Sequence, residues 1–393
     1  MISYYSSHYG LIDLLKTIFF KNAYDKLCNY FQDITGKKYV LITSSCRSAL
    51  YLAYKSIGKN GIVHTSPLTC KIALFPIIVS GNQIYFNDIK NDDWTIDPST
   101  IPLSISKESI AIQAIHFGGF PCDMVSLRQI ADDYNLILIE DCAQGFGAFK
   151  DGIPTGSMGD ISCFTFTKNL YGIGGGAFVT DNEEWYVRAK NIQSEFKRES
   201  NIKIIYRIIL FLLSNYRKNK LIDYIYIIFK KISKTQHKKY DLYNNFSTFL
   251  TKPRNLYVSS VCSRWSKIQE LIDKQKRYGT ILSQALSNIG VNINYSSSAS
   301  SSYTKFFCTT DIKAKNLIKS LNNSGIEAMH LEHKNGVYYQ EKIIYDPLFT
   351  SFITYNHLPV YNKIHDYLIS LPLNDYDRDS INQILSVLKN IIK

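Results

Sequence analysis

The first two hundred residues alternate between short apolar runs and amphipathic stretches, and this alternation restricts the chain to few folds. Strands that alternate with helices indicate an α/β unit around a mostly parallel sheet. The predicted fold class is therefore α/β, with a mostly parallel central sheet flanked by helices. We expect strands over residues 39–43, 61–65, 83–86, 110–116 and 136–141, and helices within 9–36 and over 44–58, 69–80 and 123–134.

Polar residues gather where these predicted strands end. Thr43–Arg47, His116 and Asp141 lie at or just past strand ends, and so does the segment 163–176, which runs into a glycine cluster. In open parallel sheets, ligands bind at the carboxyl ends of the strands. The sequence therefore predicts a site at this edge of the sheet.

Lys168 and Asp141 are the two residues of this edge with the most specific chemistry. Asp141 ends a buried-strand pattern, and Lys168 lies 27 residues later in a loop before Gly172. Pyridoxal phosphate chemistry needs such a pair: the amine forms a Schiff base with the cofactor aldehyde, and the carboxylate keeps the pyridine nitrogen protonated. A lone lysine of this kind is more often a solvated loop residue, and such an aspartate is more often a helix cap.

The positive charge of the chain is concentrated in one segment. The formal net charge is +12, which suits nucleic acid, an anionic membrane surface or a phosphorylated substrate. Residues 203–239 contain ten Lys/Arg and one acid, so this segment carries +9 and the rest is nearly balanced. We therefore do not expect a nucleic-acid partner.

The same segment holds two very apolar stretches, 202–213 and 221–232, which we expect to be helical. Each is too short to cross a bilayer, which takes roughly 20 residues. Two interpretations remain open. The basic, apolar insertion at about 201–240 could lie on an anionic membrane surface, or it could be a hairpin buried in a subunit interface. A pair of ordinary core helices is a third interpretation, which the dense lysines disfavour.

The eight cysteines form no C-x-x-C pair, and several lie in apolar runs. This pattern indicates reduced, buried thiols, not a disulfide framework or a zinc site. The N-terminus has no basic region followed by an apolar core, so we expect no signal peptide. The predicted location is the cytoplasm, with peripheral contact at the inner face of the membrane if the insertion binds lipid.

The pattern changes in the last third of the chain. We expect a large domain over residues 1–250 and a smaller α+β domain over 251–393. A long helix is predicted over 255–287, a loop over the serine run 296–302, and further helices over 312–324 and 378–392.

With these elements in order, the chain resembles the DegT-type nucleotide-sugar aminotransferases, pyridoxal phosphate enzymes of the aspartate-aminotransferase fold. The motifs that carry the resemblance follow one another with near-family spacing. They are Ile115-His-Phe-Gly-Gly119, Ile139-Glu-Asp-Cys-Ala-Gln144, Gly156-Ser-Met-Gly-Asp-Ile-Ser-Cys-Phe-Thr-Phe166, Lys168-Asn-Leu170, Gly174-Gly-Gly-Ala-Phe-Val-Thr180 and Ile369-Ser-Leu-Pro-Leu373.

The resemblance implies a role for each matching residue. Lys168 would hold pyridoxal 5'-phosphate and move a proton, and Asp141 would pair with the pyridine nitrogen. Gln144 would contact the ring or its hydroxyl. The remaining matches concern the cofactor phosphate, the ring face, the partner subunit's site and the substrate: they are Cys46, Arg47, Ser48 and Thr165 for the phosphate, Cys70 for the ring, Arg254 and Asn255 for the partner's site, and His116 for the substrate. For His116, a satisfied core histidine is an equally good interpretation. Outside these motifs, His330 lies in a segment that we expect to be a loop in contact with substrate or solvent.

The expected activity is transfer of an amino group, with glutamate as donor, to a nucleotide-linked keto-sugar for cell-surface polysaccharide or glycan biosynthesis. A homodimer is expected because the family builds each site from two chains. Three departures from the family pattern stand out. The segment from Thr165 to Lys168 is about two residues shorter, Cys70 replaces an aromatic residue, and the insertion at 201–240 is unusual.

Other functions were weighed against this one. A non-catalytic, membrane-associated or regulatory member should have lost Lys168 or Asp141, and related sugar dehydratases carry His in place of the lysine. The glycines at 172–176 do not open a helix as a dinucleotide fingerprint does. His330 and His333 are three residues apart, which matches neither of the metalloprotease patterns H-E-x-x-H and H-x-x-E-H. We therefore expect no metal.

Overall fold

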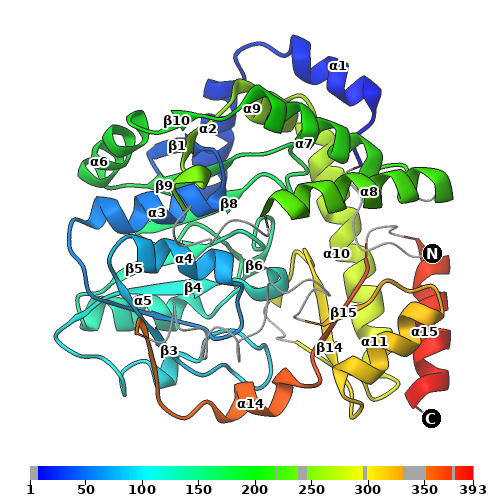
Figure 1. Cartoon of the computed structure of the whole chain (residues 1–393). Helices are drawn as coiled ribbons and strands as arrows, with labels where there is room; N and C mark the ends of the chain where they lie inside the picture. The colour runs from blue at the N-terminus through cyan, green and yellow to red at the C-terminus, as the bar shows by residue number, and fades with distance from the viewer. Residues whose placement is uncertain are drawn as a thin grey trace.

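An eight-stranded, mostly parallel sheet forms the centre of the molecule (Figure 1). The computed structural model describes residues 8–217, 219–237, 246–294, 299–330, 351–373 and 377–392, without the side chains of 230–237, 247, 248 and 330. The strand order is β1-β9-β8-β5-β4-β2-β3-β16, and only β9 runs antiparallel to its neighbours. The predicted α/β class is confirmed. The strands are β1 (Tyr39–Thr43), β2 (Ile62–Thr65), β3 (Gln83–Phe86), β4 (Ser109–Ile115), β5 (Ile137–Asp141), β8 (Ile161–Thr165), β9 (Gly176–Thr180) and β16 (Ile353–Tyr355).

Helices flank this sheet, and those before residue 135 lie where the sequence predicts them, whereas α6 is an addition. In α3, the Ser45 hydroxyl accepts a hydrogen bond from the Ser48 N–H and caps the first turn. Gly58 ends the helix with φ 77°, a left-handed conformation that favours glycine. The predicted helical region 9–36 is two helices. These elements are α1 (Leu11–Phe19), α2 (Ala23–Thr35), α3 (Cys46–Ile57), α4 (Lys71–Val79), α5 (Met124–Asp133) and α6 (Glu183–Ser194).

A second lobe is built from a four-stranded sheet with its own hydrophobic core. The strands β12 (Asn292–Ile293), β14 (Phe306–Thr309), β17 (Ile369–Leu371) and β15 (Met329–His330) pair antiparallel in this order. Leu317, Leu321, Ile384 and Leu388, from α11 (Ala314–Asn323) and α15 (Arg378–Ile392), belong to this core. The helix predicted over 255–287 is instead two helices, α9 (Asn255–Cys262) and α10 (Trp265–Ser287). The buried Arg264 stands at the break and donates to the Tyr171 carbonyl oxygen.

The chain returns from the second lobe to the large sheet. Strand β16 pairs in parallel with β3, and α14 (Pro359–His365) places Tyr361 and Ile364 in the core of the large sheet. The predicted boundary at residue 250 stays a prediction, but residues 353–368 pack with the first unit. Within the predicted serine loop, Ala299–Ser300 form strand β13, which pairs with β6 (Phe149–Lys150); residues 296–298 of that loop lie outside the described residues. Strand β6 also pairs with β7 (Ile153–Pro154), and β10 (Lys197–Arg198) pairs with β11 (Thr251–Lys252).

The insertion forms the two helices that the sequence predicts. They are α7 (Asn201–Ser214) and α8 (Lys220–His237), drawn in green in the upper part of Figure 1. Phe211 of α7 packs with Tyr9, Ile173 and Tyr257, and Leu14 of α1 packs against the same cluster. Other apolar side chains are exposed, including Ile202, Ile205, Leu221 and Tyr224 in the hairpin and Leu11, Ile12, Leu15, Ile18 and Phe19 in α1. Among the described residues, no helix has the length and apolar character to cross a membrane.

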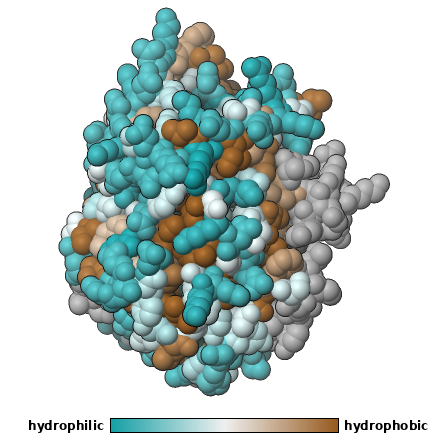
Figure 2. All heavy atoms as spheres, turned by 90° about the vertical axis from the view of Figure 1, so that its left-hand side faces the viewer, coloured by the Kyte–Doolittle hydropathy of each residue, from teal (hydrophilic) through white to brown (hydrophobic). Residues whose placement is uncertain are grey.

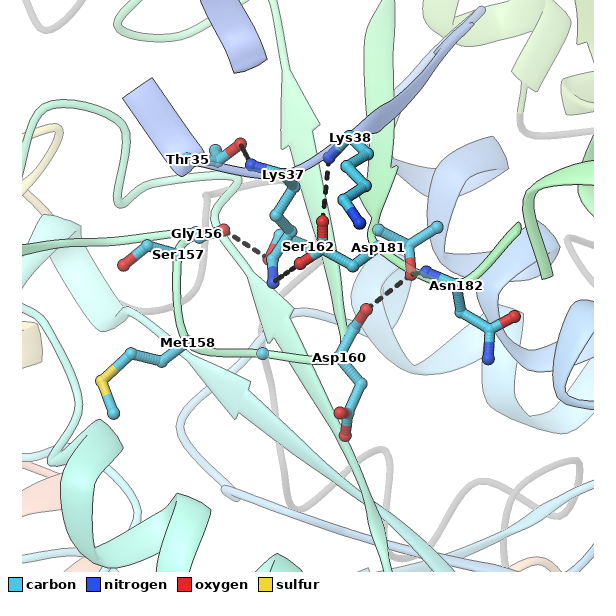
Figure 3. Close-up of polar contacts among 12 residues, drawn as sticks. Thr35, Lys37, Lys38, Gly156, Ser157, Met158, Asp160, Ser162, Asp181 and Asn182 are labelled. Atoms are coloured by element: carbon cyan, nitrogen blue, oxygen red, sulfur yellow. Dashed lines mark hydrogen bonds and ion pairs between the residues drawn. The ribbon is translucent and has the colours of Figure 1, made fainter. Parts of the chain in front are cut away.

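The amino-terminal edge of the large sheet is tied by structural polar contacts. Figure 3 shows the Lys37 ammonium reaching Asp181 (Nζ–Oδ2 3.5 Å), while the Lys38 N–H donates to the other oxygen of Asp181 (2.9 Å). Thr180 donates to the Asp160 carbonyl oxygen at the same edge.

The face of the molecule seen in Figure 2 is mostly hydrophilic, with hydrophobic side chains only in patches. The opposite edge, where the parallel strands end, holds the cavity described next.

Candidate active site

A cavity of about 470 Å³ lies at the carboxyl ends of the parallel strands. Asp141 reaches it from the end of β5, Thr165 from the end of β8, and Ser44 from just beyond β1. Lys168 lines the same cavity, and Gly172–Gly175 form its wall next to β9. The predicted convergence of these segments is therefore present in the fold, and the cavity has the size of a small-molecule site.

Asp141 is a buried carboxylate held by donors on both oxygens. Its Oδ1 accepts from the Ala143 N–H (3.0 Å), and its Oδ2 accepts from the Gln113 amide (3.2 Å). The Tyr54 hydroxyl donates to the side-chain oxygen Oε1 of Gln113 (2.9 Å), so a buried chain of three side chains fixes the carboxylate. Burial raises the pKa of Asp141, while the Ala143 N–H and the charge of Lys168 oppose the rise.

Lys168 comes from a short loop that is closed by backbone hydrogen bonds. The Tyr171 N–H donates to the Lys168 carbonyl oxygen (2.8 Å), and the Gly172 N–H donates to the Phe166 carbonyl oxygen (2.6 Å). Gly175 adopts φ 100° and donates to the Ser44 carbonyl oxygen (3.2 Å), which joins the loop to the β1 end. Although the segment before Lys168 is short, the lysine reaches the cavity.

The start of α3 forms another wall. Ser44, Ser45, Cys46 and Arg47 line the cavity where the first backbone N–H groups of the helix begin. A Cβ on Gly176 would lie 2.6 Å from the Cys46 nitrogen, so glycine is required for β9 to approach this helix start. The Arg47 guanidinium lies 4.0 Å from the centroid of the Phe249 ring. A helix start beside a guanidinium is suited to an anion such as phosphate.

The fold separates the predicted site residues into two groups. Cys46, Arg47, Cys70, Asp141, Thr165 and Lys168 line the cavity. Ser48 does not, because its hydroxyl donates to the Phe249 carbonyl oxygen. Gln144 is beside Ala143 but outside the lining, and its Oε1 is buried with no hydrogen-bond partner among the described residues.

Three further predicted residues, Arg254, Asn255 and His116, do not line the cavity of this chain. Arg254 donates to the Glu199 carbonyl oxygen and to Asn201, while Asn255 is exposed. Their predicted reach into a partner's site stays a prediction. The side chain of His330 and all of residues 331–333 lie outside the described part of the chain. His116 is fully buried and does not line the cavity, so its position does not indicate direct contact with substrate.

His116 and Glu140 form a structural pair behind the site. The His116 Nδ1 accepts from the Cys122 N–H, which places its proton on Nε2, and Nε2 donates to Glu140 (3.1 Å). The Glu140 oxygens also accept from the N–H groups of Gly156, Met158 and Gly159. Cys142 is close enough to make this a possible metal cluster by distance, but the carboxylate already uses its four acceptor positions on protein donors.

Sequence reasoning missed several residues that shape the site. Gln113 was visible as a polar residue inside an apolar strand pattern, but its partner Tyr54 was not, since only the fold brings the two together. Arg207, Leu210, Phe211 and Tyr226 of the α7–α8 hairpin also line the cavity. Lys305 is half-buried near Lys168, and burial together with that second charge lowers its pKa to about 8.

The comparisons with known proteins agree with this architecture. The sequence profile of the DegT/DnrJ/EryC1/StrS aminotransferase family matches residues 19–389. A UDP-4-amino-4,6-dideoxy-N-acetyl-beta-L-altrosamine transaminase of Campylobacter jejuni is 35% identical over 176 residues, which cover 43% of this chain and 46% of that protein. A GDP-perosamine synthase of Escherichia coli is 32% identical over 178 residues, or 44% and 49% of the two chains. The chain thus spans less than half the length of these relatives.

Solved structures are similar over nearly the whole chain. The crystal structure of DesI with its TDP-sugar product has a TM-score of 0.75 and 17% identity, covering 100% of this chain and 93% of that one. The aminotransferase TlmJ from Streptoalloteichus hindustanus has a TM-score of 0.76 and 15% identity, with 99% and 98% coverage. At these identities the likeness concerns the fold alone. Together with the profile match, it leads to one conclusion: the chain belongs to the DegT/DnrJ/EryC1/StrS aminotransferase family.

Proposed function

We propose that this protein is a pyridoxal 5'-phosphate-dependent aminotransferase that transfers an amino group to a nucleotide-linked keto-sugar. The observation that carries the proposal is the joint presence of the Lys168 amine and the Asp141 carboxylate in one cavity, beside the start of α3. An amine, a buried carboxylate and an anion-binding helix start are the three groups that this cofactor requires of a protein.

The residues of the cavity fit the cofactor. Ser44, Ser45 and Arg47 at the helix start suit its phosphate, and Lys168 suits its aldehyde. The buried Gln144 Oε1 next to the site has no hydrogen-bond partner among the described residues, which is consistent with a place for a ligand hydroxyl. No aromatic residue takes the position of Cys70, so we expect the ring face to be covered by other side chains.

Each side chain would have a distinct task. When bound, pyridoxal 5'-phosphate supplies a carbonyl carbon that captures amines and a ring that accepts electrons. Lys168 would hold it covalently through Nζ, and that amine would then carry a proton to and from the substrate carbon that bears the nitrogen. The Asp141 carboxylate, fixed by Gln113 and Ala143, would keep a positive charge on the pyridine nitrogen.

The substrate class rests on the relatives. The names of the Campylobacter jejuni and Escherichia coli proteins refer to UDP- and GDP-linked amino sugars, and a Bacillus subtilis relative is named for spore coat polysaccharide biosynthesis. We propose a keto-sugar on a nucleoside diphosphate as the acceptor, glutamate as the donor, and a role in polysaccharide or glycan synthesis.

We further propose a cytoplasmic homodimer. All eight cysteines are free thiols, which suits a reducing compartment. The apolar side chains exposed on α1 and on the hairpin, among them Ile12, Phe19 and Leu221, suit burial against a second copy.

An amino-transfer assay tests the activity. The purified protein, loaded with pyridoxal 5'-phosphate, is incubated with glutamate and a series of UDP-, GDP- and dTDP-linked 4-keto-6-deoxy sugars. We expect an amino-sugar nucleotide and an equal amount of 2-oxoglutarate with at least one member. Conversion of the keto-sugar to a deoxygenated ketone, with release of the glutamate nitrogen as ammonia and no amino-sugar, would instead indicate a dehydratase.

A further inference from the structure

The α7–α8 hairpin is part of the cavity wall. Four of its residues line the cavity that holds Lys168: Arg207, Leu210 and Phe211 from α7, and Tyr226 from α8. Phe211 and Tyr226 are buried at 6% and 7% exposure, so this inner side of the hairpin is packed in its own chain. Arg207 is the charged member of this group.

The Arg207 guanidinium is held in a defined position. Its Nη1 donates to the Tyr257 hydroxyl (2.7 Å), and its Nη2 donates to Glu199 Oε1 (3.0 Å). The Tyr257 hydroxyl also donates to the second oxygen of Glu199, so the three groups form a closed network. Tyr257 is fully buried and Glu199 is 8% exposed. Glu199 and Tyr257 therefore fix the direction of the guanidinium before any ligand binds.

The floor of the cavity leaves space for this guanidinium. A Cβ on Gly174 would lie 2.6 Å from Arg207 Nη1, so a side chain at this position would push the guanidinium away. Gly174 belongs to the loop that follows Lys168 and also lines the cavity. Arg207 thus lies directly over the loop that carries the candidate nucleophile.

The far end of the hairpin is tied to the second lobe. The Arg217 side chain donates to Asp223 (Nε–Oδ1 2.7 Å), lies 3.6 Å from Glu327, and has its guanidinium 4.7 Å from the centroid of the Tyr226 ring. Glu327 stands between α11 and β15 of the second lobe. The hairpin is therefore attached at Glu199 and Tyr257 on one side and at Glu327 on the other, which keeps Arg207 and Tyr226 at the cavity.

We propose that Arg207 binds an anionic oxygen group of the substrate, so that the α7–α8 hairpin takes part in substrate recognition. A guanidinium has five N–H donors in a planar fork that matches phosphate and carboxylate oxygens. The bonds to Tyr257 and Glu199 use two of these donors. This inference rests on the proposed function, in which both the nucleotide-sugar and the amino donor are anions.

Arg207 is distinct from the group that we assign to the cofactor. The α3 start with Arg47 supplies one anion-binding wall, and Arg207 brings a second guanidinium to the same cavity from another element. A phosphate and a carboxylate both fit this chemistry. The two sources are the diphosphate of the nucleotide-sugar and the carboxylates of glutamate, and the experiment separates them.

Binding to the cofactor-loaded protein tests the proposal, because the cofactor then occupies its own phosphate site. Inorganic pyrophosphate, UDP and GDP are titrated by calorimetry, and L-glutamate is followed by the change of the cofactor absorbance. The variants are Arg207→Met and Arg207→Lys. The control is Lys203→Met, which removes one positive charge from the exposed side of the same helix.

We expect Arg207→Met to weaken the binding of one class of probe by about 10-fold or more, as for a lost charge-assisted hydrogen bond. Arg207→Lys should fall between the wild type and Arg207→Met, since a lysine keeps the charge but not the fork, and Lys203→Met should bind as the wild type does. Weaker binding of pyrophosphate and the nucleotides assigns Arg207 to the diphosphate, and weaker binding of glutamate assigns it to the donor.

Equal binding of all probes by the wild type and both Arg207 variants would overturn the proposal, and so would a loaded wild type that binds none of them. If Arg207→Met fails to fold, the comparison of Arg207→Lys with Lys203→Met decides the question. A protein that takes up no reducible cofactor would contradict the proposed function instead. The pyrophosphate titration would then still test Arg207 by itself.

Discussion

The Asp141 carboxylate and the Lys168 amine line one cavity, although 27 residues separate them in the sequence. The charge of Lys168 opposes the burial that raises the pKa of Asp141. This relationship depends on the neighbouring parallel strands β5 and β8, which end side by side. It gives the cavity a nucleophile and a buried anion at the place where the fold gathers its loops.

Asp141→Asn should remove most of the activity without unfolding the protein. The amide keeps the shape of the carboxylate but not its charge, so we expect turnover to fall by about 100-fold or more. Burial makes the charged form of Asp141 costly in the fold, whereas the amide gives up one of the two hydrogen bonds from Ala143 and Gln113. These effects oppose each other, so the free energy of unfolding should change by no more than about 1 kcal/mol. Steady-state kinetics and urea unfolding measure the two effects. Full activity in the variant would contradict the assigned role.

Glu140→Gln should have the opposite profile, although the residue is adjacent in sequence. Glu140 is fully buried, and an amide cannot accept the bonds from Gly156, Met158, Gly159 and His116 on both of its polar atoms. We expect the free energy of unfolding to fall by about 2 kcal/mol or more. The matched control is Glu108→Gln, which is exposed and should change little.

The buried pair of His116 and Glu140 predicts a pH dependence of stability. Burial alone would raise the pKa of Glu140, but the hydrogen bonds from His116 and from the backbone N–H groups of Gly156 and Gly159 hold it below its ordinary value. A carboxyl with a lowered folded pKa contributes stability above its unfolded pKa of about 4.3, and this contribution is lost as the pH falls through the folded value. Unfolding curves from pH 6 to pH 3 should show this loss in the wild type and less of it in Glu140→Gln. Equal curves would contradict the account.

Lys305 should respond to the removal of Lys168. Burial and the Lys168 charge lower the pKa of Lys305 to about 8, below the unfolded value of about 10.4. In cofactor-free protein, Lys168→Met should therefore raise the pKa of Lys305, which competitive acetylation with mass spectrometry measures against the exposed Lys319 as internal reference. By linkage, this lysine makes stability rise with pH between about 8 and about 10.4, because the unfolded chain binds the extra proton. An unchanged Lys305 titration in the variant would refute the coupling.

The exposed apolar side of α1 tests the proposed dimer. Leu15 and Phe19 are 56% and 76% exposed, and α1 packs against the same cluster as α7. We expect Leu15→Asp with Phe19→Asp to shift the protein toward monomer in sedimentation velocity, because a charge would be buried in the interface. Leu103→Asp is the control, since Leu103 is 81% exposed on a separate loop.

The membrane interpretation of the hairpin predicts another result. A monomer in both the wild type and the variants, together with salt-sensitive flotation on anionic liposomes that is lost when Lys230 and Lys231 are neutralised, would favour lipid over a second copy.

The large sheet could be predicted because its parallel strands are buried on both faces and appear as continuous apolar runs. Each of these runs ends at a turn signal, so the residues at the carboxyl edge, including Asp141 and Lys168, could be predicted with it. Strand β16 could not be predicted in this way. It has three residues, and its pairing with β3 depends on a long-range return of the chain that local periodicity does not record.

The site was only partly predictable for a similar reason. A family motif identifies Lys168, but no motif says which side of an apolar helix such as 202–213 will meet the cavity. Arg207 therefore appeared as one basic residue of a charged segment, and its network with Glu199 and Tyr257 became visible only in the fold. Ser48 is the reverse case, since the phosphate motif includes it while the packing turns its hydroxyl to Phe249.

Borohydride reduction followed by peptide mapping tests the central assignment most directly. The protein loaded with pyridoxal 5'-phosphate is reduced, digested and analysed by mass spectrometry, beside Lys168→Ala and the control Lys190→Ala, which changes an exposed lysine of α6. The account predicts one stable pyridoxyl adduct on Lys168 in the wild type and the control, and none in Lys168→Ala. The same stoichiometric adduct at another lysine, or its retention in Lys168→Ala, would contradict it.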